Sequence, residues 1–376
     1  MLSYWEKKSF FEDIDVAIIG SGIVGLNAAI RLKESDKNLR VVVIERGFLP
    51  YGASTRNAGF TCFGSISELL DDLKTSTENE VFGLVERRFR GLERLRNRVG
   101  DKALRYEEHG GFEIFKADEK AIFDDCEAHL DFFNKSIFDI TKQKKTYRIL
   151  DKKEIQSFDF QNINNVIHNI AEGQIDTGEM MKTLLAIAEN KGVKIINGLT
   201  LKSIETQTDE VLLHADNWFF TAKKVLVCTN GFARELMPDL EVTPARNQVI
   251  ITKPIENLHL KGCFHYDRGY FYFRNIDNRI LLGGGRNLDY ETEHTSNFGT
   301  TPIIQNALKN LLQEVILPKQ KVEIDMVWSG ILGLGNVKKP IIEMLSPRVG
   351  VAVRMGGMGV AIGSLVGEDG AEMIFG

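Results

Sequence analysis

The sequence is poor in the residue patterns that build disulfide frameworks and metal sites. It has four cysteines in 376 residues, and no C-x-x-C pair indicates zinc or a redox dithiol. We therefore expect buried, reduced thiols in a cytoplasmic protein. The seven histidines show no ligand spacing such as H-E-x-x-H, so no metal site is predicted.

Long apolar runs and basic tracts are also missing. No run approaches the ~20 residues of a membrane span, and residues 1–8 lack the apolar stretch of a secretory signal. Trp5, Phe10 and Phe11 are compatible with contact at a membrane surface, but packing onto their own domain is the interpretation we favour. The net charge of −5, without a dense Lys/Arg tract, argues against a nucleic-acid partner.

The patterns that are present predict a chain of alternating strands and helices. A chain of this length favours two domains, and no low-complexity linker separates them, so we expect domains interleaved in sequence. A helix over 79–98 carries many Arg and Glu residues that we expect to form a solvated face. The other predicted elements are a helix over 179–190, a hairpin over 211–221, separate strands over 193–196 and 224–228, an antiparallel sheet within 249–285, a helix over 303–315, a strand over 350–353 and a helix over 360–374.

The N-terminal part contains a β-α-β unit with a glycine-rich turn. Strands are predicted over 15–19 and 41–44 with a helix from Ile23 to Leu32 between them, and Gly20, Gly22 and Gly25 match G-x-G-x-x-G at the start of that helix. Glu45 comes directly after the second of these strands, where its carboxylate can accept ribose hydroxyls. The helix N-terminus favours a pyrophosphate, so this unit predicts one bound dinucleotide.

Short motifs follow one another along nearly the whole chain: Gly52-Ala53-Ser54-Thr55-Arg56-Asn57-Ala58-Gly59, Gly173 to Thr177, Val225 to Gly231, Arg246-Asn247-Gln248, Ile280 to Gly285, Trp328-Ser329-Gly330 and Gly356 to Val360. Their composition and order resemble the D-amino-acid oxidase/glycine oxidase superfamily of FAD enzymes, which includes sarcosine and γ-glutamylputrescine oxidases. The resemblance is nearest to the sarcosine and γ-glutamylputrescine oxidase branch.

The resemblance implies an α/β fold with a Rossmann-type FAD-binding domain interleaved with a substrate domain on a mainly antiparallel sheet. We expect residues 1–78, 150–240 and 325–376 in the first and 79–149 and 241–324 in the second. FAD is expected to be non-covalent, because no cysteine lies C-terminal of Cys263. The expected cofactor contacts are Gly20, Gly22, Ile23, Val24, Gly25, Glu45, Arg46, Ser54, Thr55, Arg56, Asn57, Ala58, Gly59, Thr229, Asn230, Gly231, Gly330, Gly356, Gly357, Met358, Gly359 and Val360.

The chain departs from its relatives where they bind substrate. Leu332 stands where amino-acid oxidases carry a carboxylate-binding arginine, and Ala361 where sarcosine oxidases carry a lysine. Leu281 aligns with the lysine associated with oxygen reaction, which favours a dehydrogenase slightly. Other cations could replace the arginine, and we expect Tyr272, Arg274 and Arg56 to contact substrate; the further cations considered are Arg246, Arg286 and Arg354. Arg274 can share a strand face with Tyr270 and Tyr272, and the alternative is that these aromatic residues belong to the core and Arg274 forms a structural or surface ion pair.

These features predict oxidation of a small primary or secondary amine, or an amino-acid derivative. Hydride would pass to flavin N5, and the imine would hydrolyse. Molecular oxygen or a respiratory quinone would accept the electrons. The alternatives are an FAD-dependent 2-hydroxy-acid or glycerol-phosphate dehydrogenase, a domain acting on tRNA or an assembly partner, and a catalytically silent flavoprotein.

Overall fold

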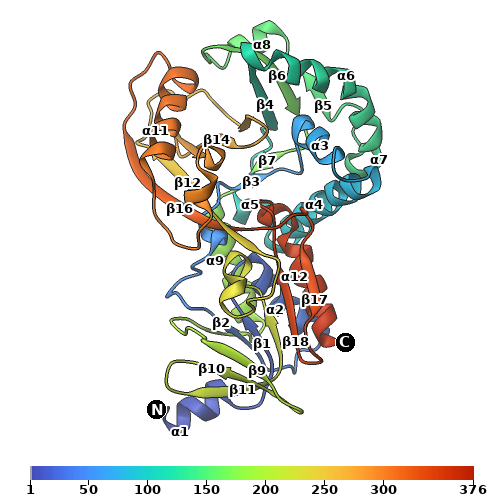
Figure 1. The fold of residues 1–376 in the computed structure, drawn as a ribbon, viewed down its shortest axis with the longest axis vertical. Coiled ribbons are helices and arrows are strands. Elements are labelled where there is room, and N and C mark those ends of the chain that lie inside the picture. Colours follow the sequence, from blue (N-terminus) through green and yellow to red (C-terminus); the bar gives the residue numbers. More distant parts are fainter. Residues whose placement is uncertain (1) are drawn as a thin grey trace.

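The computed structural model describes residues 2–376, which form two lobes, each built on an eight-stranded sheet (Figure 1). The lower lobe in that view contains β1 and β2, and the upper lobe contains β4, β6 and β12 to β16. This architecture confirms the expected α/β class with one mainly antiparallel sheet.

The lower sheet has a parallel centre of short, buried, β-branched strands. β1 pairs in parallel with β2 and with β11, and β11 pairs in parallel with β18. The predicted hairpin and the strand after it are not separate, because β11 continues unbroken through both. The strands of this sheet are β1 (Ile14–Ile19), β2 (Val41–Ile44), β8 (Lys194–Ile196), β9 (Ser203–Thr206), β10 (Val211–His214), β11 (Phe219–Val227), β17 (Ile341–Met344) and β18 (Val349–Val353).

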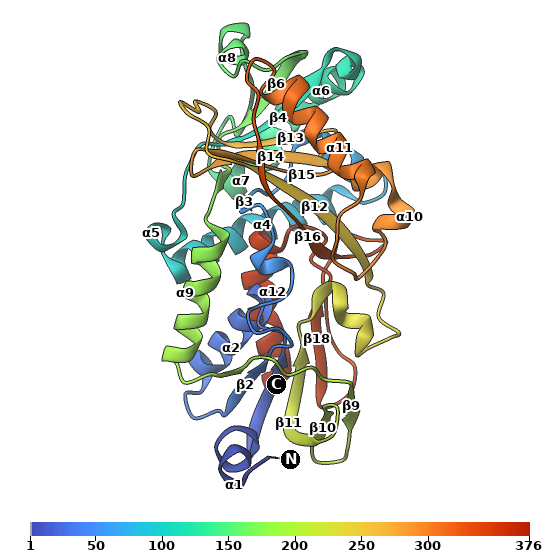
Figure 2. The same ribbon diagram turned by 90° about the vertical axis from the view of Figure 1, so that its left-hand side faces the viewer.

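Helices α2, α9 and α12 cover one face of the lower sheet, and α4 lies across them at the junction of the lobes (Figure 2). Their apolar faces share a core with β1 and β2, and the opposite face of the sheet packs a second core under the β9–β10 hairpin. The helices are α2 (Ile23–Ser35), α4 (Glu78–Val99), α9 (Thr177–Asn190) and α12 (Gly359–Phe375).

The upper sheet is antiparallel apart from one parallel pair, β13 with β4. One face packs against α11 (Pro302–Leu311), and the β4–β6 end packs against α3 (Ile66–Leu73) and α6 (Lys120–Ser136). Its strands are β4 (Gly111–Lys116), β5 (Tyr147–Ile149), β6 (Ile163–Asn169), β12 (Thr243–Thr252), β13 (Cys263–Tyr266), β14 (Phe271–Ile276), β15 (Arg279–Gly284) and β16 (Ile324–Leu334).

Shorter elements connect the two sheets. Near the junction of the lobes, β3 (Phe60–Thr61) pairs with β7 (Gly173–Gln174). The remaining short helices are α1 (Tyr4–Glu6), α5 (Asp101–Leu104), α7 (Phe138–Thr141), α8 (Lys152–Gln156) and α10 (Tyr290–Glu293).

Strand pairing divides the chain differently from the expected domain limits. The limits at 150 and 325 would split the upper sheet, because β6 follows the first limit and β16 crosses the second. Both strands hydrogen-bond within the upper sheet, β6 to β4 and β5 and β16 to β12. We therefore move the proposed limits beyond these strands, to the segments that follow β6 and β16.

The predicted solvated face of α4 is present in part, since Glu78, Glu80, Arg90 and Glu93 are exposed. Two of the arginines depart from the prediction. Arg88 is 2% exposed, and its guanidinium donates to the Phe63 carbonyl oxygen at 3.1 Å. Arg98 pairs with Glu34 of α2 and Glu368 of α12 at 3.0 and 2.5 Å, because the end of α4 lies across both helices.

The N-terminal segment follows the expected packing onto its own domain only at Phe11, and the cysteines are buried as expected. Phe11 packs against Trp218 and Phe220, with ring centroids 4.9 and 5.0 Å away, whereas Trp5 and Phe10 remain exposed. All four cysteines are buried and unpaired. Within residues 2–376, no helix has the length and hydropathy to span a bilayer.

Candidate cofactor and substrate cavities

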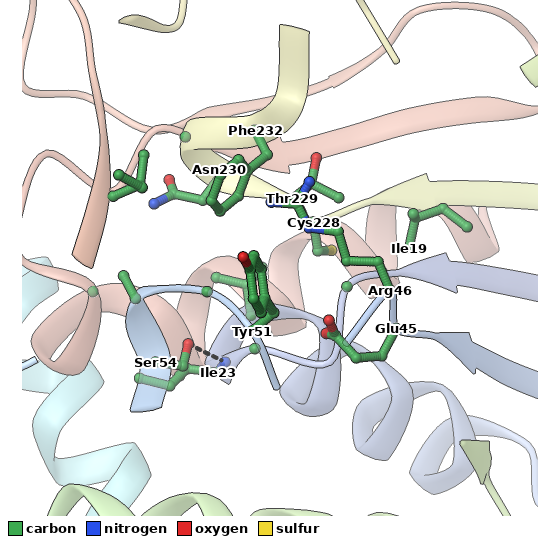
Figure 3. Close-up of a pocket in the computed structure, with 18 of the residues that line it drawn as sticks. Ile19, Ile23, Glu45, Arg46, Tyr51, Ser54, Cys228, Thr229, Asn230 and Phe232 are labelled. Atoms are coloured by element: carbon green, nitrogen blue, oxygen red, sulfur yellow. Dashed lines mark hydrogen bonds between the residues drawn. The ribbon is translucent and has the colours of Figure 1, made fainter. Parts of the chain in front are cut away.

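The turn between β1 and α2 forms the floor of a cavity of about 160 Å³ at the carboxyl ends of the parallel strands, which we call the first cavity. Gly20 has φ +104°, and a Cβ at Gly25 would lie only 2.0 Å from the Gly20 carbonyl oxygen. The turn therefore requires glycine at both positions, as a helix packed directly on its strand demands. Ile23 N–H donates to Ser54 Oγ at 2.9 Å, a bond drawn in Figure 3.

Glu45 lies at the end of β2 beside this turn and lines the first cavity. Its side chain is 5% exposed and accepts from Ser21 N–H and Oγ at 3.1 and 2.8 Å and from Gly47 N–H at 2.9 Å. These bonds hold the carboxylate against the glycine turn, which is the position that ribose hydroxyls require.

Arg46 and two aromatic rings form another wall of the first cavity. The guanidinium lies 3.9 Å from the Phe232 ring centroid and 4.9 Å from that of Tyr51, and it pairs with Glu235 at 2.9 Å. Figure 3 shows Asn230 and Phe232 across the cavity from Ser54. A flat apolar wall with a cation suits a nucleotide base or sugar.

A second cavity, of about 390 Å³, lies between the two lobes. The helix α12 begins beside it, so N–H groups of its first turn lack intrahelical acceptors there and carry the positive end of the helix dipole. The two cavities share five lining residues, so they adjoin one another: Ala53, Asn57, Leu332, Gly357 and Val360.

Most of the expected cofactor contacts line these two cavities. Those on the first are Gly20, Gly22, Ile23, Val24, Glu45, Arg46, Ser54, Asn57, Thr229, Asn230, Gly231, Gly357, Gly359 and Val360. Those on the second are Arg56, Asn57, Ala58, Gly59, Gly330, Gly356, Gly357, Met358 and Val360, together with Tyr272.

Three expected site residues line neither cavity. Gly25 packs the helix on the strand, and Thr55 turns its hydroxyl back to the Pro50 carbonyl oxygen at 2.9 Å. Arg274 is 3% exposed and donates to the carbonyl oxygens of Gly59 at 3.1 Å and Ile175 at 2.7 Å. The expectation that Arg274 binds substrate is therefore corrected: its guanidinium ties β14 to the segment beside the cavity.

The two other expected substrate contacts do face the second cavity. The Tyr272 hydroxyl accepts from Asn247 Nδ2 at 3.2 Å, and burial raises the pKa of that hydroxyl well above its usual value. Arg56 donates to the Ser329 carbonyl oxygen at 3.1 Å and lies 4.2 Å from the Phe298 ring centroid. Both groups can therefore present hydrogen-bond donors to a bound molecule.

The second cavity also has polar residues that no motif indicated. Lys338 pairs with Glu68 at 3.2 Å and Asp72 at 2.7 Å, and these carboxylates raise the pKa of the lysine despite its burial. Since the lysine and its two carboxylates come from opposite ends of the chain, no local pattern could have predicted the cluster. The polar residues on this cavity that the sequence did not indicate are Glu68, Asp71, His265, Arg268 and Lys338. Asn247 belongs to the Arg246-Asn247-Gln248 motif, and Tyr270 and Arg286 are among the residues that the sequence offers as substrate contacts.

A largely buried cluster of Cys62, Glu172 and His265 lies at the wall of the second cavity, which Cys62 and His265 line. One ligand atom from each lies within 4.8 Å of the others, although the sequence spacing predicted no metal site. His265 Nε2 is 3.4 Å from Cys62 Sγ, and Glu172 accepts from Phe63 N–H at 3.0 Å. Burial raises the pKa of Glu172 to about 7 and lowers that of His265 to about 4, so burial disfavours charge on both groups.

The fold and the glycine turn define a dinucleotide-binding α/β protein, and the second cavity leaves space between its two lobes. Residues 15–373 match the model of the DAO family, described as FAD dependent oxidoreductase, and the chain belongs to that family. It is therefore an FAD-dependent enzyme of a family that acts on amines and amino acids.

Curated relatives cover almost the whole chain. A probable oxidoreductase OrdL from Haemophilus influenzae is 22% identical over 97% of this chain and 84% of its own length. The γ-glutamylputrescine oxidoreductase of Escherichia coli is 25% identical over 96% of this chain and 83% of its own.

Solved structures share the fold at low sequence identity. L-proline dehydrogenase from P. horikoshii superposes with a TM-score of 0.77 at 18% identity, covering 97% of this chain and 94% of that one. Glycine oxidase from Geobacillus kaustophilus gives 0.77 at 20% identity, with 96% and 94% covered. At this identity the likeness establishes the fold alone.

Proposed function

We propose that this protein oxidises a C–N bond of a small primary or secondary amine. The amine carbon would lose a hydride to flavin N5 and the nitrogen a proton, and water would then hydrolyse the imine to a carbonyl compound and the released amine. The observation that carries the proposal is the junction of the two cavities. A nucleotide held at Gly20 to Val24 can extend its ring past Asn57 and Gly357 to face Tyr272.

The described residues fit FAD on grounds that do not depend on the family match. The Thr229 hydroxyl is buried on the first cavity without a hydrogen-bond partner among residues 2–376, which suits a ligand acceptor. A Cβ at Gly22 would lie 2.8 Å from Ser54 Oγ, in the space where the main chain must approach a pyrophosphate. We propose the cavity-lining residues named above as the cofactor contacts. When bound, FAD supplies the electron acceptor for C–N oxidation.

The protein's own groups would orient the amine and stabilise charge. The first turn of α12 places N–H groups and a positive dipole end beside the second cavity, where negative charge on a reduced ring would be stabilised. Tyr272, held by Asn247, can hydrogen-bond the substrate nitrogen. At the position of the usual carboxylate-binding arginine, Leu332 presents an apolar wall to both cavities.

An alcohol substrate is the second candidate, because the second cavity has a histidine that could accept an alcohol proton. His265 lines this cavity, which the sequence did not indicate. Burial lowers its pKa to about 4, so it is a weak base. Amine oxidation needs no such base when the amine binds neutral, and we therefore favour the amine.

The electron acceptor would be oxygen or a quinone. Leu281 is buried outside both cavities, and Lys338 is the lysine that lines the second one, already paired with two carboxylates. This pairing and Leu281 favour a dehydrogenase over an oxidase.

The cellular location is proposed from the cysteines. Four unpaired buried cysteines support a cytoplasmic location.

Anaerobic reduction of the purified yellow protein tests the proposal. Amines, α-amino acids and 2-hydroxy acids are mixed separately with the enzyme, and the visible flavin band is followed. Bleaching by amines alone supports the proposal, and bleaching by hydroxy acids alone overturns it. Reoxidation on admitting air then separates an oxidase from a dehydrogenase.

A further inference from the structure

The second cavity carries more positive charge than its own carboxylates neutralise. Lys338 pairs with Glu68 and Asp72, and Asp71 pairs with Lys74 at 3.0 Å. Among residues 2–376, the three cavity arginines form no ion pair: Arg56, Arg268 and Arg286. A partly enclosed wall with unpaired guanidinium groups attracts an anion.

Arg286 is the best positioned of these three arginines. Its guanidinium carbon lies 5.4 Å from the ring centroids of both Tyr270 and Tyr290, and the two phenol oxygens hydrogen-bond to each other at 2.6 Å. Gly285 N–H donates to the Tyr270 carbonyl oxygen at 2.8 Å, which fixes the main chain beside Arg286. Arg268, by contrast, is exposed in a turn.

Contacts with aromatic rings leave the N–H edges of a guanidinium available. Arginine has five donors in a planar fork, and a carboxylate accepts two of them in parallel. A lysine could not present the same pair of donors. The two tyrosine rings therefore hold Arg286 in an orientation suited to a planar anion.

The position of Arg286 indicates how far that anion lies from the reacting amine. Tyr270 and Tyr272 both face the second cavity, two residues apart on the chain. Tyr270 lies in the turn directly before β14 and Tyr272 lies on β14, and two residues of extended chain separate their Cα atoms by roughly 7 Å. Arg286 contacts Tyr270, whereas the amine is expected at Tyr272. In an α-amino acid the amine and carboxylate share one carbon and could not reach both positions.

We propose that Arg286, oriented by Tyr270 and Tyr290, binds the carboxylate of an amine substrate in which several bonds separate the carboxylate from the oxidised carbon. This inference rests on the proposed amine oxidation and names its substrate class. In this protein the substrate carboxylate would bind at the open end of the β14–β15 hairpin, and not at the position of Leu332, where amino-acid oxidases carry their arginine. The preferred substrates are therefore ω-amino acids and similar carboxylated amines.

The test compares 5-aminopentanoate, pentylamine and norvaline, which have the same chain length, as substrates of the FAD-loaded enzyme. We expect kcat/KM to be at least about tenfold higher for 5-aminopentanoate than for the other two. Arg286→Met should raise KM for 5-aminopentanoate about 10- to 100-fold and leave pentylamine within about twofold. Arg286→Lys should raise KM for 5-aminopentanoate less than Arg286→Met does.

Arg90→Met is the matched control, since it removes the same charge from an exposed position on α4. Arg90→Met should leave kcat/KM unchanged for both 5-aminopentanoate and pentylamine. Equal losses for both substrates in Arg286→Met, or no preference in the wild type, would overturn the inference while leaving amine oxidation intact.

A binding measurement separates failure of the inference from failure of the proposed function. Pentanoate, which cannot be oxidised at nitrogen, is titrated against the oxidised enzyme while the flavin spectrum is followed. If no amine bleaches the flavin, the proposed function fails. In that case the anion site is still supported if Arg286→Met binds pentanoate at least tenfold more weakly than the wild type does. If the variant binds pentanoate as tightly as the wild type, or if the wild type does not bind it detectably, the anion site is overturned.

Discussion

The first cavity takes its shape from main-chain turns on a parallel sheet, whereas the second takes its shape from side chains on an antiparallel sheet. Gly20, Gly22 and Gly25 leave almost no freedom of substitution, because added Cβ atoms would meet backbone or Ser54. The second cavity instead gathers Tyr272, Lys338 and Arg286 from separate elements. Side chains can be replaced without moving a strand, so substrate binding can change while cofactor binding does not.

The largest effect is expected from a side chain in the glycine turn. Gly25→Val places a Cβ about 2.0 Å from the Gly20 carbonyl oxygen and should lower the free energy of unfolding by more than about 3 kcal/mol, with loss of flavin. Thermal unfolding and the ratio of flavin to protein absorbance measure both effects. Gly83→Ala is the control, because nothing lies within 4 Å of its added Cβ in α4, and it should stabilise by about 0.5–1 kcal/mol. A Gly25→Val protein with normal flavin content would show that the turn tolerates rearrangement.

Arg274 tests whether a cation near the second cavity acts on structure or on substrate. Arg274→Met leaves the carbonyl oxygens of Gly59 and Ile175 without their donor and should cost about 3 kcal/mol of unfolding free energy. The KM for the amine should stay within about twofold in the protein that remains folded. Denaturant unfolding and steady-state kinetics check the two parts. A large rise in KM with unchanged stability would return Arg274 to the substrate site.

A buried carboxyl group in the upper lobe should make the free energy of unfolding of the protein depend on pH. Glu113 is 4% exposed, contacts Ser67, and burial raises its pKa from 4.5 to about 7. Because the pKa of this carboxyl is higher in the folded than in the unfolded state, it contributes its full stabilisation of the folded state below about pH 4.5. That contribution is lost as the pH rises through the folded-state pKa of about 7.

The wild type should therefore lose on the order of 2 kcal/mol of unfolding free energy from this group between pH 5 and 8. Urea unfolding at both pH values measures the difference. Glu113→Gln should lower this difference by the contribution of Glu113, since the amide does not titrate, and should leave the part due to Glu172, whose pKa is also raised to about 7. An identical pH dependence in the variant would show that Glu113 is not the group responsible.

The smallest effect concerns the carboxylate beside the glycine turn. Glu45→Gln keeps the shape of the side chain but replaces one acceptor of N–H groups with a donor. We expect FAD to bind roughly tenfold more weakly, about 1.4 kcal/mol. Flavin fluorescence on dilution measures the dissociation constant. Glu205→Gln, which changes a carboxylate on the exposed β9, should leave it unchanged. Equal affinity in Glu45→Gln would remove ribose binding from the roles of Glu45.

Local patterns predicted the floor of the first cavity, because the strands, the turn and the helix that form it are adjacent in the sequence. The β1–α2–β2 unit and its glycines all lie between Ile14 and Ile44, and hydrophobic period and turn chemistry determine them. Glu45 follows from the end of the second strand.

The second cavity could not be predicted in the same way. Tyr272 and Arg274 do alternate on one strand, but the long arginine side chain reaches past the cavity to main-chain carbonyls. Lys338 meets Glu68 only because the C-terminal part of the chain folds back onto the N-terminal part. A residue that belongs to a cofactor-binding motif also need not point its side chain at the cofactor. The Thr55 hydroxyl, for example, donates to the Pro50 carbonyl oxygen.

The packing of α12 on α2 has a consequence for when the cofactor can be held. A Cβ at Gly367 would lie 2.4 Å from the Val24 carbonyl oxygen, and one at Gly363 would lie 2.8 Å from Ile23 Cγ2, so the two helices approach almost backbone to backbone. One of them begins at the glycine turn near the N-terminus, and the other begins at the turn of the second cavity. During synthesis, the N-terminal β-α-β unit emerges from the ribosome long before α12. We therefore expect stable loading of the flavin to wait until α12 has been made, and ribosome-bound chains that lack α12 should remain colourless.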